Sequence, residues 1–169
     1  MHILDTDRLS LRWLEASDAP FILELLNEPS WLRFIGDKNV RTLDDARGYI
    51  ANGPAAMYAR HGFGLYRVAL KNNGVPIGLC GLIKRDTLPD VDIGFAFLPK
   101  FCGQGYARES AAAVLAYGCN TLGLKRIVAV TSLDNESSAR LLEKIGLRFE
   151  RTIQLAGNAE TLRLFASEV

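Results

Sequence analysis

The chain has 169 residues, 49% of them hydrophobic and 23% charged, a composition that predicts one globular domain over residues 1-169 with a buried core. Its 20 basic and 19 acidic residues leave a formal net charge of +1, which argues against a protein that binds nucleic acid through a broad basic field. We therefore expect one site on one domain rather than several modules.

The cysteines, the histidines and the N-terminus predict the cellular compartment and whether a metal is bound. Cys80, Cys102 and Cys119 are odd in number and lack C-x-x-C spacing, and the first residues lack the charged-then-apolar pattern of an export signal. No apolar run reaches the roughly 18 residues of a membrane span. His2 and His61 are too few for a catalytic zinc site. The expectation is a reduced, cytoplasmic protein with no membrane, nucleic-acid or metal partner.

The chain opens with a strand and a helix. Residues 8 to 14 alternate polar and apolar side chains, which predicts a half-buried strand. Ser17 and Asp18 are favourable N-cap residues and are followed by apolar residues at helical spacing. The first helix is therefore expected over about residues 18 to 27.

The next stretch is less regular. Residues 28 to 40 mix turn formers with bulky apolar side chains, which favours an irregular flap that could cover a substrate. Thr42 followed by Asp45 resembles a capping box. A short second helix should begin there and stop at Gly53 and Pro54.

The middle of the chain changes to a period of two. Residues 63 to 70 and 75 to 84 predict two strands, and the Asn-Asn-Gly sequence at 72 to 74 predicts the turn of a hairpin between them. A further strand is expected over residues 91 to 98, stopped by Pro99.

Strands and helices alternate in the remainder. Residues 107 to 122 carry apolar side chains on one helical side, and Gly123 is placed to end that helix. The elements expected after it are a strand at 126 to 131, a helix at 135 to 145 and two closing strands at 147 to 153 and 161 to 165. Antiparallel strands followed by a β-α-β-α order predict an α/β domain with a single mixed sheet and helices packed on it.

Small residues separate the strand at 91 to 98 from the helix at 107 to 122. Gly103 and Gly105 lack Cβ atoms, so the backbone there can adopt positive φ and approach a ligand closely. The first turn of the helix leaves N–H groups free, and the helix dipole makes that end partly positive. Phosphate or pyrophosphate is the natural occupant of such a site.

The spacing narrows the choice of phosphate ligand to dinucleotides and coenzyme A, because the G-x-x-x-x-G-K-[ST] pattern of a P-loop is missing. A dinucleotide fold expects a small residue at position 108 and an acidic residue about 20 positions further on, where this chain has Arg108 and Lys125. It also expects the motif near the start of the fold. All three expectations of a dinucleotide fold fail.

Five ordered motifs resemble the GNAT N-acetyltransferase superfamily, and within it the Rim-type branch that acetylates the N-termini of ribosomal proteins. The segment Lys100 to Gly105 stands in the place of the fingerprint [Gln/Arg]-x-x-Gly-x-[Gly/Ala]. The five motifs, the third of which overlaps this fingerprint, are TDRLSLR at 6 to 12, IG at 77 to 78 with DIGF at 92 to 95, GQGYARE at 103 to 109, NESS at 135 to 138 and KIGL at 144 to 147. The resemblance covers essentially the whole chain.

The resemblance implies a mostly antiparallel sheet with helices on both faces and a splayed gap between its fourth and fifth strands. It also implies that acetyl-CoA binds along this gap. Its pantetheine arm would pair with Phe95, Ala96 and Phe97. Its pyrophosphate would be held by the backbone amides of Cys102, Gly103, Gln104, Gly105, Tyr106 and Ala107. Asn135 would reach it from the far side of the gap.

Several of these residues have a second interpretation. Lys100, in place of the family's Gln or Arg, and Arg108 could assist the phosphates or be solvated surface charges. Asn135 could instead cap the helix that follows it. Cys102 has no histidine nearby in the sequence, so a spectator role is favoured over nucleophilic catalysis.

The resemblance also suggests catalytic residues. Asp92 stands where the family often has a glutamate, which makes it the candidate base, directly or through water; the alternative is an exposed carboxylate at a strand end. The family's tyrosine, seven positions after the asparagine, is replaced by Leu142. Ser138 lies on about the same helical face as Asn135, so it or a water would protonate the leaving thiolate. Ser138 could also contact the cofactor passively or only bond its own helical turn.

The expected function is transfer of an acetyl group from acetyl-CoA to a primary amine by direct attack in a ternary complex, in a monomer or homodimer. The amine would be a protein N-terminus or a small molecule. The alternatives are a non-catalytic acyl-CoA-binding module and a flavin or nicotinamide enzyme.

The acceptor should be selected by the flap at 28 to 40 and the loops at 54 to 62 and 154 to 160. Three aromatic residues could line its pocket or belong to the core: Trp31, Phe34 and Tyr66.

Overall fold

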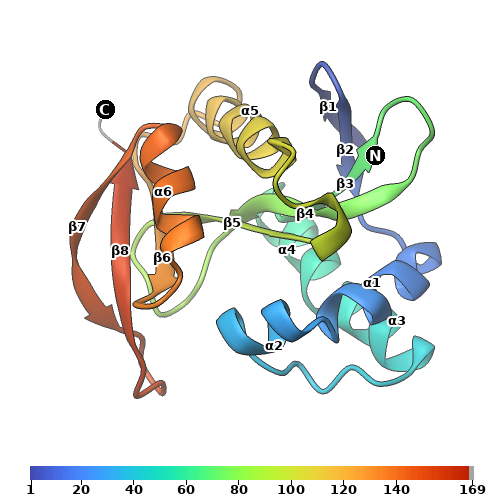
Figure 1. Ribbon diagram of the computed structural model, residues 1–169, viewed down its shortest axis with the longest axis horizontal. Helices are drawn as coiled ribbons and strands as arrows, with labels where there is room; N and C mark the ends of the chain where they lie inside the picture. Colours follow the sequence, from blue (N-terminus) through green and yellow to red (C-terminus); the bar gives the residue numbers. More distant parts are fainter. Residues whose placement is uncertain (168–169) are drawn as a thin grey trace.

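Within residues 1–167, which the computed structural model describes, eight strands form one sheet in the order β1-β2-β3-β4-β5-β6-β8-β7 (Figure 1). The strands are β1 (His2–Asp5), β2 (Leu9–Trp13), β3 (Leu65–Leu70), β4 (Pro76–Ile83), β5 (Val91–Phe97), β6 (Ile127–Ser132), β7 (Leu147–Gln154) and β8 (Thr161–Ser167). All neighbours pair antiparallel except β5 and β6, which are parallel. The predicted single, mixed and mostly antiparallel sheet is therefore confirmed.

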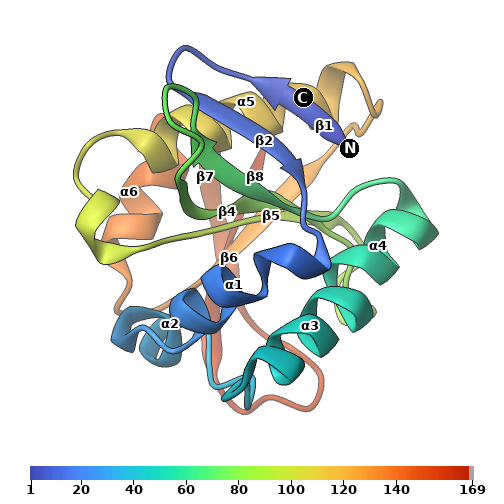
Figure 2. The same ribbon diagram turned by 90° about the vertical axis from the view of Figure 1, so that its right-hand side faces the viewer.

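Helices cover both faces of this sheet (Figure 2). The α-helices are α1 (Ala19–Leu26), α2 (Pro29–Phe34), α3 (Leu43–Asn52), α4 (Pro54–His61), α5 (Tyr106–Asn120) and α6 (Glu136–Lys144), with short 3-10 turns η1 (Ala16–Asp18) and η2 (Pro99–Phe101). Helices α5 and α6 lie on one face, and α1 to α4 gather on the other. No helix of the described chain is long and apolar enough to cross a membrane.

Two apolar clusters fix the layers. Leu82 and Ile93 of the sheet share one buried cluster with Val114 of α5. Leu79 shares a second cluster with Leu25 of α1 and Ile50 of α3. Apolar side chains therefore leave β4 and β5 on both faces, as the continuous apolar sequence of β4 requires of a central strand.

The parallel pair β5 and β6 separates almost as soon as it forms. Its register contains only Val91 opposite Ile127 and Asp92 opposite Val128. Beyond that point β5 continues to Phe97 with β4 on one side only. The splayed gap that the resemblance implied is present, and the α5 half and the α6 half of the molecule lie on its two sides (Figure 1).

Local sequence signals located several elements correctly. The hairpin β3–β4 turns through Gly74 at a φ of 73°, and the capping box of Thr42 and Asp45 opens α3. The expected irregular flap at 28 to 40 was wrong in part, because residues 29 to 34 form α2. Proline is pre-organised for the first helical turn, and Pro29 begins α2 there while Trp31 is buried against α1 and α3.

Two further elements were not predicted. Strand β1 pairs with β2 at the edge of the sheet. Helix α3 does stop before Gly53, but Pro54 starts α4, so the expected acceptor loop at 54 to 62 is mostly helix. The same proline that ends one helix is favourable in the first turn of the next.

Asp18 stands at the N-cap of α1, as predicted, but its side chain makes no capping hydrogen bond. Its carboxylate oxygens accept hydrogen bonds from both terminal nitrogens of Arg12, each at 2.9 Å, and Arg67 Nε lies 3.4 Å away. The Asp18 side chain is only 7% exposed. A buried ion group at the junction of β2, β3 and η1 therefore takes the place of the expected cap.

Replacing Asp18 by asparagine should lower the free energy of unfolding by about 3 kcal/mol, because two guanidinium groups would lose their buried counter-charge. Urea unfolding measures the change. Asp44→Asn is the matched control, since Asp44 also pairs with an arginine but is 88% exposed, and it should change the stability by less than about 1 kcal/mol. Equal effects of the two substitutions would contradict the assignment of a buried ion group.

Candidate functional site

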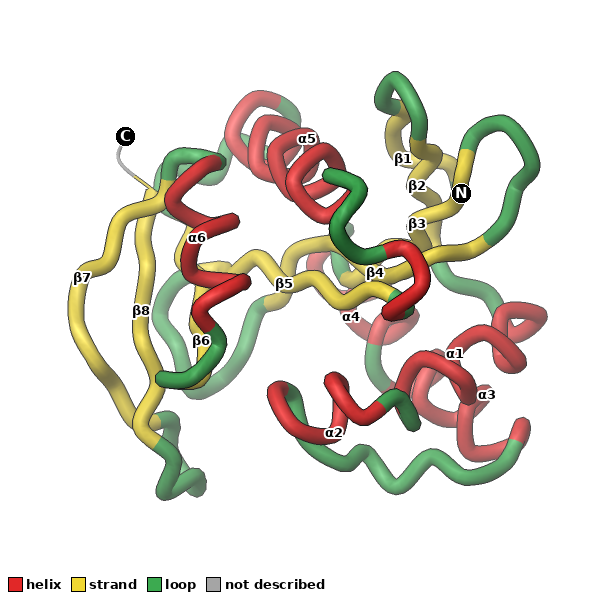
Figure 3. Tube along the Cα trace, in the orientation of Figure 1, coloured by secondary structure: helices red, strands yellow, loops and turns green. Residues whose placement is uncertain are grey.

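The loop between η2 and α5 has the backbone that its glycines predicted. Gly103 and Gly105 have φ values of 77° and 84°, in the left-handed region that side chains with Cβ rarely adopt. Figure 3 shows this loop leading directly into the first turn of α5. The residues from Cys102 to Gly105 are exposed, so the start of the helix is open to solvent.

A run of backbone N–H groups at this junction has no partner among the residues of the described chain. They belong to Gly103, Gln104, Gly105, Tyr106, Ala107 and Arg108. The first internal bond of this region is the one from Glu109 N–H to the carbonyl oxygen of Gly105, at 3.0 Å. Consecutive unpaired donors at the positive end of a 15-residue helix are an arrangement that suits an anion, and we call the segment Gly103 to Arg108 the cradle.

Cys102 departs from the expectation. Its N–H donates to the carbonyl oxygen of Pro99 at 3.1 Å, so this amide is not available to a ligand. Although the residue as a whole is exposed, partial desolvation raises the pKa of the Cys102 thiol, which favours the protonated form. The sulfur lies 3.6 Å from the carbonyl oxygen of Leu98. The cradle therefore begins at Gly103.

The free edge of β5 lies beside this cradle. Because β6 has diverged, alternate backbone groups after Asp92 face the gap without a neighbouring strand. Gly94, Phe95 and Ala96 are half-buried there, whereas Phe97 is buried in the core. An unpaired strand edge readily accepts an extended chain that carries amide groups.

Asp92 occupies the vertex of the gap, at the last paired position of β5 and β6. The alternative of an exposed carboxylate is wrong, since the side chain is only 1% exposed. Arg85 Nε lies 3.0 Å from one carboxylate oxygen and 3.3 Å from the other. Burial raises the pKa of Asp92 above its ordinary value, although the Arg85 guanidinium opposes the shift.

The other side of the gap is formed by β6 and α6. The Asn135 side-chain oxygen accepts a hydrogen bond from the Ser138 N–H at 3.3 Å, so Asn135 does cap α6. Ser138 is half-buried on the first turn. Leu142 is 1% exposed within the main core cluster, so an apolar contact has taken the place where the family often has a tyrosine.

The aromatic candidates for an acceptor pocket separate into two groups. Tyr66 is fully buried in the core, and Trp31 of α2 is buried against α1 and α3, with its indole nitrogen lacking a hydrogen-bond partner in the described residues. Phe34 is half-buried beneath the Arg33 guanidinium, which lies 4.6 Å from the ring centroid. Arg33 also forms an ion pair with Asp134 at 3.0 Å, which joins α2 to the loop before α6.

No sequence pattern indicated the ion pair between Arg33 and Asp134. The two residues are separated by 101 positions, and neither belongs to a motif. The two basic residues that could assist the phosphates, Lys100 and Arg108, are both exposed. Among residues 1–167, no three His, Cys, Asp or Glu side chains gather in a way that could hold a metal ion.

Comparison with known proteins agrees with the resemblance to the GNAT superfamily found in the sequence. The acetyltransferase (GNAT) domain family matches residues 8–148. An uncharacterised N-acetyltransferase of Bacillus subtilis, YoaA, is 32% identical over 154 residues, which are 90% of this chain and 86% of that protein. A crystal structure of an acetyltransferase from Agrobacterium tumefaciens is 26% identical with a TM-score of 0.84, and the match covers 98% of this chain and 94% of that one.

A likeness in fold alone extends to the Rim-type enzymes. RimL, a ribosomal L7/L12 α-N-protein acetyltransferase solved in complex with coenzyme A, has a TM-score of 0.84 at 18% identity, covering 100% of this chain and 98% of that one. The family match spans most of the sequence and includes both the strand β5 and the cradle that follows it. The chain therefore belongs to the GNAT acetyltransferase family.

Proposed function

We propose that the protein transfers the acetyl group of acetyl-CoA to a primary amine, either the α-amino group of a protein N-terminus or the amine of a small molecule. The observation that carries this proposal is the run of unpaired amides from Gly103 to Arg108 next to the free edge of β5. The unpaired amides suit a diphosphate, and the free strand edge suits the amide-bearing pantetheine arm. The two features adjoin each other, as the diphosphate and the pantetheine arm do in coenzyme A.

The cradle fits a diphosphate by shape as well as by charge. No atom lies within 4 Å of the position that a Cβ would occupy on Gly103, so a ligand can approach the backbone there. Amides of Gly103, Gln104, Gly105, Tyr106 and Ala107 would donate to its oxygens, and the exposed Arg108 adds positive charge nearby. The pantetheine arm would then follow β5 past Phe97, Ala96 and Phe95 toward the vertex of the gap.

The chemistry would take place near Asp92, in a ternary complex and without a covalent intermediate on the protein. Bound acetyl-CoA supplies a thioester carbonyl that an amine can attack. Asp92, directly or through a water, accepts the proton of the attacking amine, and its raised pKa brings it closer to the pH range where a base is effective. Backbone N–H groups on the free edge of β5 donate to the oxygen that gains charge.

Protonation of the leaving thiolate is assigned to α6. Leu142, in the place of the family's tyrosine, has no ionisable group, so Ser138 or a water takes this role. Asn135 helps to line the same side of the gap.

The rival function is an acyl-CoA-binding module without turnover. It is favoured only by the absence of the family's tyrosine at position 142. Isothermal titration with CoA and a thiol-release assay over a panel of N-terminal peptides and small amines separate the two. Binding without release from any acceptor would favour the rival.

Gly105→Glu should abolish binding of CoA, because a carboxylate would fill the anion cradle and repel the diphosphate. Isothermal titration measures the loss. Gly62→Glu is the matched control: Gly62 has a φ of 79°, close to the 84° of Gly105, and lies at the end of α4, away from the cradle. Both variants place a glutamate at a left-handed backbone position, so equal CoA affinities would contradict the placement.

Asp92→Asn should lower kcat by about 100-fold while leaving the CoA dissociation constant unchanged, since general base catalysis contributes roughly that factor. Steady-state kinetics with the best acceptor of the panel and a CoA titration give the two numbers. A kcat within threefold of the parent would remove Asp92 from the mechanism. A parallel loss of CoA affinity would instead indicate a structural role.

Arg85→Met should move the acidic limb of the kcat/KM profile to higher pH. The Arg85 guanidinium favours the charged carboxylate, so its removal raises the pKa of Asp92 further, and the base form is then reached only at higher pH. A pH-rate series on both proteins tests the direction of the shift. A limb that stays in place or moves to lower pH would mean that another group titrates.

A further inference from the structure

We propose that Arg8 is a positioning residue for coenzyme A, which it serves by holding the cradle loop through Gln104 and Glu109. The inference rests on the proposed function, because it concerns the same anion site. Arg8 belongs to the turn between β1 and β2, far along the sequence from the loop that it touches. Its contacts cross a separation of 96 residues to Gln104 and 101 residues to Glu109.

The cradle loop needs a support from outside. Its own amides are unpaired, so they cannot fix the backbone, and two of its residues are glycines with many accessible conformations. Arg8 Nη1 donates to the carbonyl oxygen of Gln104 at 3.0 Å. Among the described residues, this is the only hydrogen bond that reaches the segment Gly103 to Gly105 from a distant part of the chain. Holding that carbonyl fixes the direction of the adjoining amides.

A second set of bonds fixes the first turn of α5. The Glu109 carboxylate accepts hydrogen bonds from Arg8 Nε at 2.7 Å, from the Arg8 backbone N–H at 2.9 Å and from Thr6 Oγ1 at 2.6 Å. Although burial acts to raise it, these bonds from Thr6 and Arg8 hold the pKa of Glu109 below its ordinary value. The carboxylate is therefore charged and saturated with donors.

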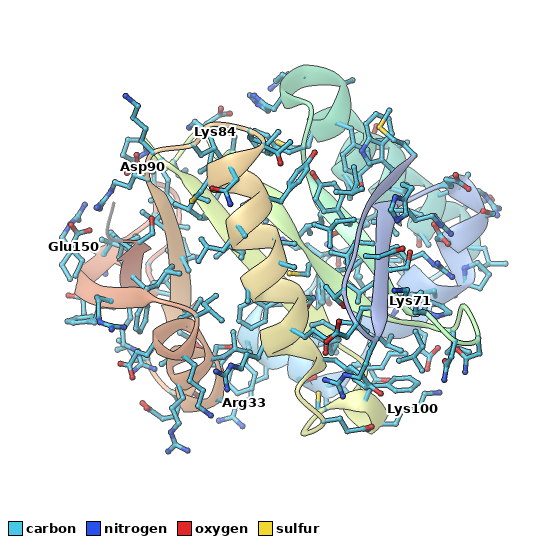
Figure 4. The ribbon with its side chains drawn as sticks, turned by 90° about the horizontal axis from the view of Figure 1, so that it is seen from above. Arg33, Lys71, Lys84, Asp90, Lys100 and Glu150 are labelled. Atoms are coloured by element: carbon cyan, nitrogen blue, oxygen red, sulfur yellow. The ribbon has the colours of Figure 1, made fainter. Side chains whose placement is uncertain are left out.

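The turn that carries Arg8 is itself rigid. Thr6 N–H donates to the Leu9 carbonyl oxygen at 2.9 Å, and Leu9 N–H returns a bond to Thr6 Oγ1 at 3.0 Å. Lys71 Nζ donates to the Thr6 carbonyl oxygen at 3.0 Å. Figure 4 shows Lys71 and Lys100 on the same side of α5, the side on which β1 and β2 lie. The edge of the sheet thus holds the end of the helix.

The guanidinium also sets the limits of the cradle. It lies 4.4 Å from the centroid of the Tyr106 ring, and its Nη2 would be 3.3 Å from a Cβ placed on Gly105. Glu109, one turn into the helix, would repel a diphosphate if its charge were left alone. Arg8 neutralises that charge at 2.7 Å, so the helix end stays attractive to anions.

The experiment compares binding of CoA with binding of pantetheine, which lacks the diphosphate and the nucleotide, by NMR titration of the full chain. Arg8→Met should weaken CoA binding about tenfold, the usual cost of about one charge-assisted hydrogen bond, and leave the pantetheine dissociation constant within twofold. Arg8→Lys should fall between the parent and Arg8→Met, because lysine restores the charge but cannot bond the carboxylate and the carbonyl together.

Arg12→Met is the matched control. Arg12 lies on β2, just after the turn that carries Arg8, and its guanidinium also donates to a carboxylate, that of Asp18, which is not part of the cradle. Its loss should lower the melting temperature without changing the ratio of the two dissociation constants. The inference is overturned if Arg8→Met keeps the parent's CoA affinity, or if it weakens CoA and pantetheine in equal proportion. A parent protein that fails to bind CoA overturns the proposed function as well.

Discussion

The early parting of β5 and β6 is the constraint on which the site depends. Two paired positions hold the parallel strands together, and past Asp92 the backbone edge of β5 faces an open gap. Strand β4 keeps β5 straight on its other side, so the free edge leads to η2 and the loop before α5 without a break. The buried carboxylate of Asp92, the unpaired strand edge and the unpaired helix amides therefore follow one another along the chain, which is the order in which the proposed function would use them.

A loop with unpaired backbone N–H groups is less constrained, because a donor that is free for a ligand makes no hydrogen bond that would hold the loop in place. The loop is held instead by side chains that approach from behind. Arg8 and Thr6 come from the β1–β2 turn, and Glu109 receives them on the first turn of α5. This arrangement gives a physical role to the N-terminal motif TDRLSLR, which resemblance alone left without one.

Local rules predicted what local sequence decides: the β3–β4 hairpin, the capping box of Thr42 and the left-handed glycines of the cradle. They failed where distant contacts decide. Asp18 binds Arg12 and Arg67 instead of capping α1, and no local pattern indicated that Asp92 is buried beside Arg85. Nothing near Pro29 or Pro54 distinguishes a helix start from a helix stop. The residues alone indicated a phosphate site and favoured coenzyme A over a dinucleotide, and the resemblance added the acetyl group and its transfer to an amine.

The most direct test of the account is a titration of the ¹⁵N-labelled protein with CoA, followed through its backbone amide signals. We expect the largest changes at Gly103 to Arg108, where the amides are unpaired, with further changes along the free edge of β5. Saturation by CoA with these signals unmoved, and the largest changes elsewhere in the chain, would contradict it.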